Sequence, residues 1–254
     1  MSKNFELMQE AGMSMGAPAI PVAKPHAPVS DHKERDLTKR DECTVNKAAQ
    51  EESLKLVQRV FLSGSEGSPR VVVFAAIDSA SGCSEICAHT AETLAGHHLG
   101  SVCLVDGNLR SPSLPDFFGV SNHYGLTDAL REQGAIRGFS KQVRGENLWL
   151  LSSGSVAAEF PPLLNGVGMK SRVDELRREF DYVLINVPAL NTYADGIALG
   201  QLADGVVLVV EANSTRRESA SKVAQSLRAA QIRILGAVLN KRTYPIPEPL
   251  YRIL

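Results

Sequence analysis

The residues with the clearest chemical potential lie between Val71 and Ala91, where an apolar run is followed by small residues and a helix-like pattern. A strand, a small-residue loop and a helix in this order can cradle a phosphate, because the first N–H groups of the helix point at the anion. Such a site also needs a lysine for the phosphate and a hydroxyl for Mg²⁺. On this template Gly82 and Ser84 are in place, but Cys83 stands at the lysine position and Ile77 at that of the leading glycine. The sequence predicts the shape of a phosphate site without its cation.

The elements that must position this loop alternate between strands and helices. Continuous apolar runs are typical of a parallel sheet covered on both faces, so the pattern predicts a mostly parallel α/β fold. A helix over residues 46–62 should pack on the core or on a neighbouring subunit, and a short helix over 124–132 has Thr127 as its expected N-cap. The predicted strands are 71–77, 102–105, 148–153, 181–187, 204–212 and 232–240.

The bulk composition narrows the class of protein. The chain has 254 residues with 27 Lys and Arg against 28 Asp and Glu, so no global field favours nucleic acid or an anionic membrane. Four cysteines without regular spacing indicate free thiols in a reducing compartment. No window reaches the ~18 apolar residues of a membrane span. We expect a cytoplasmic protein that reaches the inner membrane only through a partner.

The chain is predicted to contain one folded domain with two tails. Residues 1–45 hold too little clustered apolar sequence to fold and are expected to form a flexible tail. Residues 46–243 form the domain, and 244–254 a proline-containing C-terminal tail. In that tail, Tyr244 and Tyr251 are either phosphorylated by a partner kinase or part of a docked segment.

Together with the loop unit of residues 71–91, three further stretches resemble one family, in order over roughly residues 50 to 243. VCLVDGNLRSPSLPDFFGVSNHYGLTDAL is similar to its second Walker motif, DYVLINVPAL to its Walker B strand, and the text from ADGVVLVVEA to LNKR to its C-terminal third. The family is the cytoplasmic kinase domain of bacterial tyrosine kinases of capsule and exopolysaccharide synthesis, a relative of the deviant-Walker partitioning and division-site ATPases. The resemblance implies a P-loop NTPase-like fold, ATP with Mg²⁺, and a membrane polysaccharide co-polymerase or an active kinase homologue as partner, in a homo- or hetero-oligomer.

The departures from this family fall on its charged groups. The loop lysine falls on Cys83, the second acid of the Asp-x-Asp pair on Asn108, and the Walker B acid on Asn186, while Asp106 keeps its carboxylate. Losing one such group typically costs ~10²-fold in rate or more, so no catalytic residue is expected here. The family's Glu-x-x-Arg-x-x-Arg helix aligns as Glu52, Lys55 and Gln58.

Some nucleotide-binding character survives on this template. Gly82, Ser84 and Asp106 occupy family positions, and Asn240 matches a strand-end asparagine that resembles an adenine reader. The sequence predicts at most weak, vestigial binding of ATP or ADP with Mg²⁺, and no metal-ligand spacing of the zinc type is present.

Three functional hypotheses follow. The first is a catalytically inactive tyrosine-kinase-like protein with a regulatory or scaffolding role in exopolysaccharide synthesis and export. The second is a working ATP-dependent tyrosine kinase or deviant-Walker ATPase with an unorthodox site. A third, minor one is a thiol sensor built on Cys83 and Cys87, four residues apart on one helical face.

Overall fold

The computed structural model describes residues 50–62, 67–79, 81–97, 99–155 and 166–242. The predicted tails, with Tyr244 and Tyr251, lie outside these residues. Within them, the strands form one seven-stranded sheet of order β3-β4-β2-β5-β1-β6-β7. Every pairing is parallel except that of β3 with β4. The strands are β1 (Val71–Ala76), β2 (Val102–Asp106), β3 (Lys141–Gln142), β4 (Leu148–Leu151), β5 (Tyr182–Val187), β6 (Gly205–Glu211) and β7 (Ile234–Asn240).

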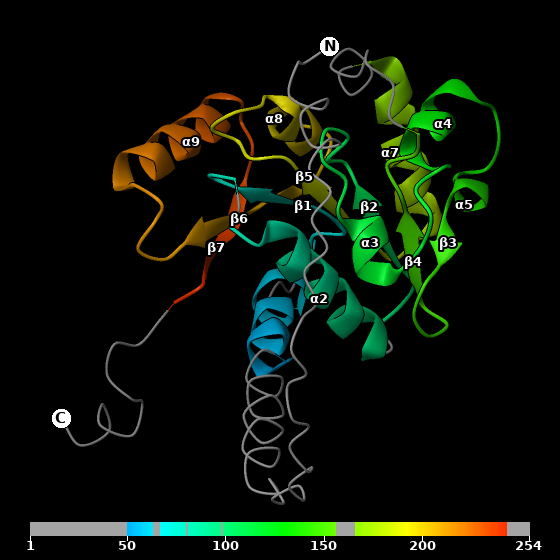
Figure 1. Ribbon diagram of the computed structural model, residues 1–254, viewed down its shortest axis with the longest axis horizontal. Coiled ribbons are helices and arrows are strands. Elements are labelled where there is room, and N and C mark those ends of the chain that lie inside the picture. The colour runs from blue at the N-terminus through cyan, green and yellow to red at the C-terminus, as the bar shows by residue number, and fades with distance from the viewer. Residues whose placement is uncertain (1–49, 63–66, 80, 98, 156–165, 243–254) are drawn as a thin grey trace, which may run out of the picture. The chain divides into compact units, whose positions relative to one another are not determined.

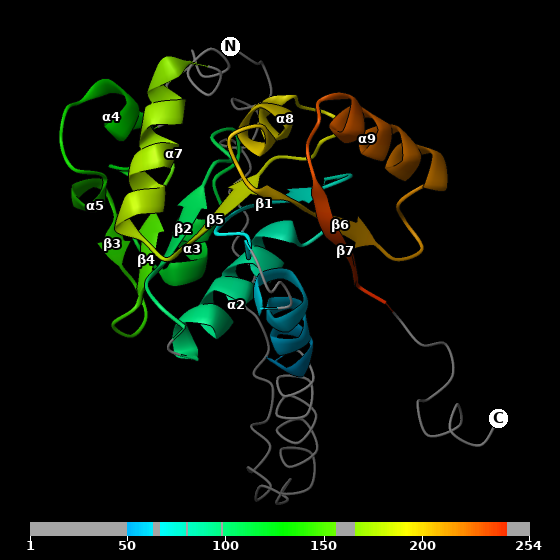
Figure 2. The ribbon, with the colours of Figure 1, turned by 180° about the vertical axis from the view of Figure 1, so that it is seen from behind.

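Helices cover both faces of this sheet. Figures 1 and 2 show α2 on one face and α7, α8 and α9 on the other. Among the described helices, none is both long and apolar enough to cross a lipid bilayer. The helices are the π-helical turn η1 (Gln58–Leu62), α2 (Cys83–Gly96), α3 (Leu114–Phe118), α4 (Leu126–Arg131), α5 (Ile136–Phe139), α7 (Val167–Glu179), α8 (Asp195–Gly200) and α9 (Arg217–Ala229).

The central strand β1 feeds two separate apolar cores. Val73 belongs to the cluster that contains Val173 of α7 and Leu227 of α9. Its neighbour Phe74 belongs to the opposite cluster, with Leu94 of α2. Successive strand side chains face opposite sides of a sheet, so a continuous apolar run fills both cores at once. This confirms the predicted parallel sheet with helices on both faces.

The helix that precedes the sheet packs on the α2 side. Residues 50–57 are α-helical and continue into η1. Val57, Val60 and Phe61 are buried in the same core as α2, and the Phe61 ring meets Tyr182 edge to face at 5.6 Å. Of the two predicted contacts for this helix, packing on the core is therefore present.

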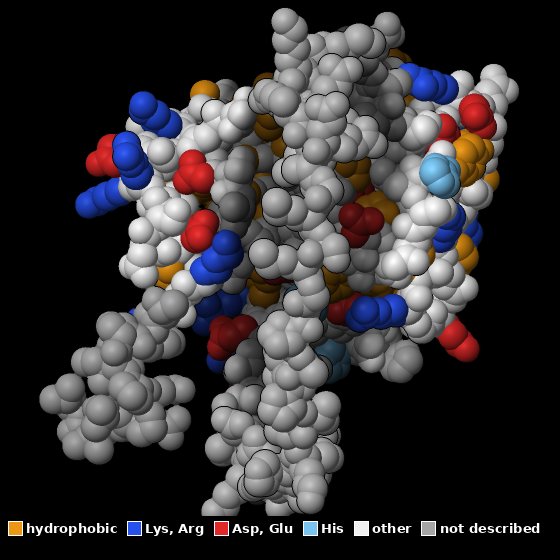
Figure 3. Space-filling view, viewed as in Figure 1, with side chains coloured by type: hydrophobic (Ala, Val, Ile, Leu, Met, Phe, Trp, Pro, Cys, Tyr) orange, Lys and Arg blue, Asp and Glu red, His pale blue; other side chains and the backbone are white. Residues whose placement is uncertain are grey.

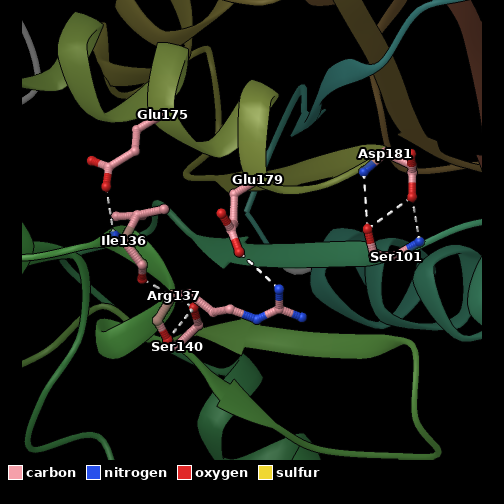
Figure 4. Close-up of polar contacts among 7 residues, drawn as sticks. All are labelled: Ser101, Ile136, Arg137, Ser140, Glu175, Glu179 and Asp181. Carbon is pink, nitrogen blue, oxygen red and sulfur yellow. Dashed lines mark hydrogen bonds and ion pairs between the residues drawn. The ribbon is translucent and has the colours of Figure 1, made fainter.

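Carboxylates fasten the amino ends of the strands. Asp204 Oδ2 accepts the Val71 N–H at 2.8 Å, and its carboxylate pairs with Arg177. Asp181 Oδ2 accepts both the N–H and the hydroxyl of Ser101 at 2.8 Å (Figure 4). Asp204 therefore caps the amino end of β1, where it also accepts the Arg70 N–H at 2.7 Å.

Two further carboxylates join α5 to α7 (Figure 4). Glu175 Oε1 accepts the Ile136 N–H at 2.7 Å, which caps the first turn of α5. Glu179 forms an ion pair of 2.7 Å with Arg137. Because Glu175 and Glu179 are four residues apart on α7, they share one helical face.

Two local expectations were wrong. Thr127 is not the N-cap of α4, because the helix begins at Leu126 and the Gly125 N–H donates to the Asp128 carboxylate at 2.8 Å. The strand predicted over 148–153 ends at Leu151, since the Ser152 carbonyl accepts the Leu126 N–H at 2.7 Å instead of a strand N–H.

The surface of α9 carries both signs of charge. Arg217, Glu218, Lys222 and Arg228 are exposed along it. Figure 3 shows blue and red side chains interspersed on that side of the molecule. This distribution agrees with the balanced composition of the chain.

Candidate functional site

A cavity of about 620 Å³ lies beyond the carboxyl ends of β1, β2 and β5. Three segments line it, namely the loop that leads into α2, the residues after β2 and the residues after β5. In open parallel sheets, ligands bind in such a crevice at the carboxyl edge, and its volume is within the usual range for ligand pockets. It is therefore the candidate functional site.

Gly82 places the loop against the end of β7. Its backbone is left-handed, with φ 74° and ψ 25°, and it precedes the first residue of α2. Asn240 Nδ2 donates to the Ser81 carbonyl at 2.8 Å, and a Cβ at position 82 would lie 2.6 Å from that same nitrogen. Glycine is thus required at position 82 both for its φ and for the close approach of Asn240. Asn240, the expected adenine reader, here holds the loop.

Cys83 supplies no charge to the cavity. Its side chain is 7% exposed at the start of α2, and burial raises the pKa of the thiol to about 12. Burial, together with nearby Cys83 and Asp106, raises the pKa of Cys87 well above its ordinary value. Reactive cysteines are accessible thiolates, so two buried, protonated thiols argue against the thiol-sensor hypothesis.

A buried polar cluster lies at the ends of β2 and β5. Asp106 and Asn186 are register partners across the two strands, and Asn186 Nδ2 donates to Asp106 Oδ1 at 3.3 Å and to Ser84 Oγ at 3.1 Å. The Ser113 hydroxyl lies 2.7 Å from Ser84 Oγ. Within the described part of the chain, Asn186 Oδ1 has no hydrogen-bond partner. The structure thus brings together three of the residues singled out in the sequence and adds Ser113.

The Asp106 carboxylate is held by backbone donors. It accepts N–H groups from Ser113 and Leu114 at 3.1 Å and from Asn108 at 3.3 Å. Burial raises the pKa of Asp106 to about 6, against the opposing effect of these hydrogen bonds and of Asn186. Desolvation therefore outweighs hydrogen bonding, and near neutral pH the group is close to its titration range.

The other residues after β2 and β5 are committed to structural contacts. Asn108 Oδ1 accepts the Ser111 N–H at 3.2 Å. Arg110 Nε donates to Asp195 Oδ2 at 3.0 Å, and its guanidinium lies over the Tyr193 ring, 4.3 Å from the centroid. Among the described residues that line the cavity, Arg110 is the only Lys or Arg. Arg110 is thus already held in an ion pair.

Sequence reasoning missed several residues of this site, among them Asp78, Glu85, Ser113 and Tyr193. Ser113 is the N-cap of α3, with a proline at the start of that helix. The Ser-x-Pro order was a signal that could have marked this helix start. Tyr193 lines the cavity, but no local pattern distinguishes it, because its role depends on the folded position of Arg110.

The sheet order and the glycine before α2 define a P-loop NTPase-like fold, and solved structures agree. The VpsO kinase domain superposes with a TM-score of 0.72 at 24% identity, covering 80% of this chain and 98% of that one. The chimerical protein CapA2B2 gives 0.72 at 22% identity, over 76% and 85%. MinD of Pyrococcus horikoshii, in complex with Mg-ADP, gives 0.58 at 21%, over 73% and 77%. At these identities the likeness shows the fold.

Curated proteins of similar sequence are named as bacterial tyrosine-protein kinases or as a polysaccharide transport protein. Tyrosine-protein kinase YwqD of Bacillus subtilis is 31% identical over 139 residues, which are 55% of this chain and 59% of that protein. The putative tyrosine-protein kinase CapB of Staphylococcus aureus is 27% identical over 182 residues, 72% and 79% respectively. The succinoglycan biosynthesis transport protein ExoP of Rhizobium meliloti is 28% identical over 190 residues, 74% and 24%. No family model matches the chain. The chain is a homologue of the bacterial tyrosine-protein kinases, and it spans less than two thirds of YwqD.

Proposed function

We propose that this protein is a catalytically inactive homologue of the bacterial tyrosine-protein kinases, with a regulatory or scaffolding role in exopolysaccharide or capsule synthesis and export. The observation that carries the proposal is the charge of the cavity. The lysine position holds the buried, protonated thiol of Cys83, and Asn186 pairs with Asp106 where two carboxylates would hold Mg²⁺. Arg110 is already paired with Asp195.

The magnitudes favour inactivity. Phosphoryl transfer depends almost wholly on positioning and on cations that neutralise the developing charge. Removing one such stabilising group costs ~10²-fold or more, and here Cys83, Asn108 and Asn186 change the site together. A triphosphate in this cavity would also lie near the carboxylates of Asp78 and Glu85. We therefore expect no turnover, and nucleotide binding that is weak or absent.

The relatives support the pathway and the kind of partner. One of them is named for succinoglycan biosynthesis transport, another is the putative tyrosine-protein kinase CapB, and a similar fold is found in the chimerical protein CapA2B2. On this basis the proposed partner is a membrane polysaccharide co-polymerase or an active kinase homologue. Through it the protein would reside on the cytoplasmic side of the inner membrane.

A second candidate function is ATP-dependent tyrosine kinase or ATPase activity. Its support is that several relatives are named tyrosine-protein kinases. In addition, Ser84 and the left-handed Gly82 are retained in the loop, and Asp106 is retained behind it. Such activity requires some other group to neutralise the phosphate charge.

The deciding experiment is calorimetric titration of the full chain with ATP and ADP, with and without Mg²⁺, alongside a phosphate-release assay. Absence of binding at millimolar nucleotide is the expected result. Tight, Mg²⁺-dependent binding with turnover would instead establish the second candidate.

The same titration on a charge-restored variant tests the cause. Cys83→Lys with Asn108→Asp and Asn186→Asp should gain Mg²⁺-dependent nucleotide binding, since it returns the cation and the carboxylates. Adding Mg²⁺ should also raise the Tm of the variant, because the ion relieves repulsion between Asp106 and the new carboxylate. Asn213→Asp, on an exposed residue, is the matched control and should change neither readout. No gain in the triple variant would mean that charge loss is not what disables the site.

A further inference from the structure

The two edge strands of the sheet differ in length and in charge. At one edge, β3 has only two residues and carries a lysine, two features that protect an edge from pairing with other chains. At the other edge, β7 has seven residues, ILGAVLN, without a charge or a proline (Figures 1 and 2). Among the described residues, no strand pairs with the outer side of β7. Native proteins cover or blunt an edge of this length.

The backbone groups on that outer side belong to Ala237 and Leu239. The Asn240 carbonyl accepts the Ala212 N–H at 2.9 Å and therefore faces β6. The register with β6 is regular from Ala237 to Asn240, and successive residues of a strand turn their N–H and C=O groups to opposite edges. The groups of Ala237 and Leu239 thus point away from β6. Both residues are exposed, and the apolar Leu239 is exposed by 54%.

The sequence that follows β7 suits this edge. Residues 244–250 read YPIPEPL, with a proline at every second position. Within sheets, proline is confined to edge strands, where the nitrogen that lacks a hydrogen is turned to solvent. Prolines at alternate positions all turn to the same side, which leaves the N–H groups of Tyr244, Ile246 and Glu248 on the other side. Each residue before a proline is also restricted to extended backbone. The spacing is therefore that of a strand that pairs along one side only.

We infer that residues 244–249, the proline segment, add to the outer side of β7 as an antiparallel strand of the same chain. Tyr244 pairs with Leu239, and Ile246 pairs with Ala237. In this register the non-proline N–H groups turn to β7 and the proline nitrogens turn to solvent. The inference is independent of the proposed function, because it concerns the edge of the sheet and not the cavity.

The connection and the side chains agree with this register. The turn comprises residues 240–243, and four-residue loops are among the common hairpin connections. Lys241, within the turn, has a left-handed backbone with φ 55°. Residues directly opposite in an antiparallel pair have neighbouring side chains on one face of the sheet. Tyr244 therefore covers the exposed side chain of Leu239, and the tyrosine belongs to a docked segment.

Amide hydrogen exchange of the full chain, measured by NMR at Ala237 and Leu239, tests the pairing. Both N–H groups should be protected in the wild type, because each donates to a carbonyl of the proline segment. Ile246→Pro removes the N–H that faces Ala237, so exchange at Ala237 should become at least about tenfold faster. Ile246→Ala keeps that N–H and should have a smaller effect.

Pro247→Ala is the matched control for the proline substitution. Position 247 turns its nitrogen to solvent in this register, so alanine removes no hydrogen bond to β7. Exchange at Ala237 should change by less than about threefold, which reflects only the greater freedom of the unpaired segment. Unchanged exchange at Ala237 in Ile246→Pro, or equal effects of Ile246→Pro and Pro247→Ala, would overturn the inference.

A cysteine pair tests the register and the identity of the chain that fills the edge. Opposite residues of a hydrogen-bonded antiparallel pair have Cα atoms about 5.5 Å apart, which a disulfide can bridge. In a Cys43→Ser background, Ala237→Cys with Ile246→Cys should form an intramolecular disulfide at least about tenfold faster than Ala237→Cys with Pro247→Cys. The side chain at position 247 lies on the opposite face of the sheet. The native thiols that remain are buried, namely those of Cys83, Cys87 and Cys103.

Three results would contradict the docked strand. The first is exchange of the wild-type Ala237 and Leu239 amides at the rate of an unprotected chain. The second is equal rates of disulfide formation for the two cysteine pairs, because a segment without a fixed register brings either cysteine to position 237. The third is a disulfide formed only between two copies of the protein, since a second chain then fills the edge of β7.

Discussion

Ionisation of Asp106 should destabilise the folded protein as the pH rises. Burial raises the pKa of this carboxyl from its ordinary value of 3.8 to about 6, and the folded state therefore binds the proton more tightly than the unfolded chain. The stability that Asp106 contributes is fully present below about pH 4 and is lost as the pH rises through 6. A shift of about two pKa units corresponds to about 3 kcal/mol.

Urea unfolding of the wild type and of Asp106→Asn, at intervals between pH 3 and 7.5, isolates this contribution. Other titrating groups are shared, so they cancel in the difference between the two unfolding free energies. Relative to Asp106→Asn, the wild type should lose about 3 kcal/mol over this range. The substitution also alters the hydrogen bonds from the Ser113 and Leu114 N–H groups. This part of the difference in unfolding free energy does not depend on pH, so it does not affect how the difference changes with pH.

Asp181→Asn provides a control of opposite sign. Hydrogen bonds from the N–H and hydroxyl of Ser101 lower the pKa of Asp181. The stability that the Asp181 carboxylate contributes is therefore present above the pKa it has in the unfolded chain, and it is lost as the pH falls. The unfolding free energy of the wild type should thus rise relative to that of Asp181→Asn as the pH rises through this range. A flat or rising difference for Asp106→Asn would refute the reasoning, because it would mean that the carboxyl is not desolvated between β2 and β5.

Two further changes test the packing around the site. Gly82→Ala should destabilise the protein by ~1–2 kcal/mol, because it combines a positive φ with a Cβ 2.6 Å from Asn240 Nδ2. Adding Asn240→Ala should recover the stability lost through the clash with Asn240, but not the stability lost through the positive φ. If the effects of the two substitutions were strictly additive in a double-mutant cycle, the contact between positions 82 and 240 would be contradicted. Phe61→Ala should reduce the unfolding free energy by ~3–5 kcal/mol, whereas the half-exposed Leu62 should tolerate alanine within ~0.5 kcal/mol. Equal effects at the two positions would show that this helix is not docked as described.

The sequence alone determined the architecture and the absence of a lysine from residues 77–84. Apolar runs such as Val71–Ala76 are local, and a strand that is apolar at every position must be covered on both faces. The place of Cys83 after Gly82 is likewise a matter of spacing. The start of α4 could not be predicted in the same way, because both the Thr127 hydroxyl and the Asp128 carboxylate could cap a helix at this point. In the structure the Gly125 N–H donates to Asp128, and the distant Ser152 carbonyl accepts the Leu126 N–H, which helps to fix where the helix begins.

Only the tertiary structure decided the state of the site. Asp106 and Asn186 are 80 residues apart, Arg110 and Asp195 are 85 apart, and the contact of Asn240 with the loop spans 159 residues. A pKa or an unpaired acceptor depends on burial and on neighbours supplied by other strands, and no local spacing records them. Sequence spacing therefore predicted which charges are absent, and the folded sheet determined which groups pair in their place.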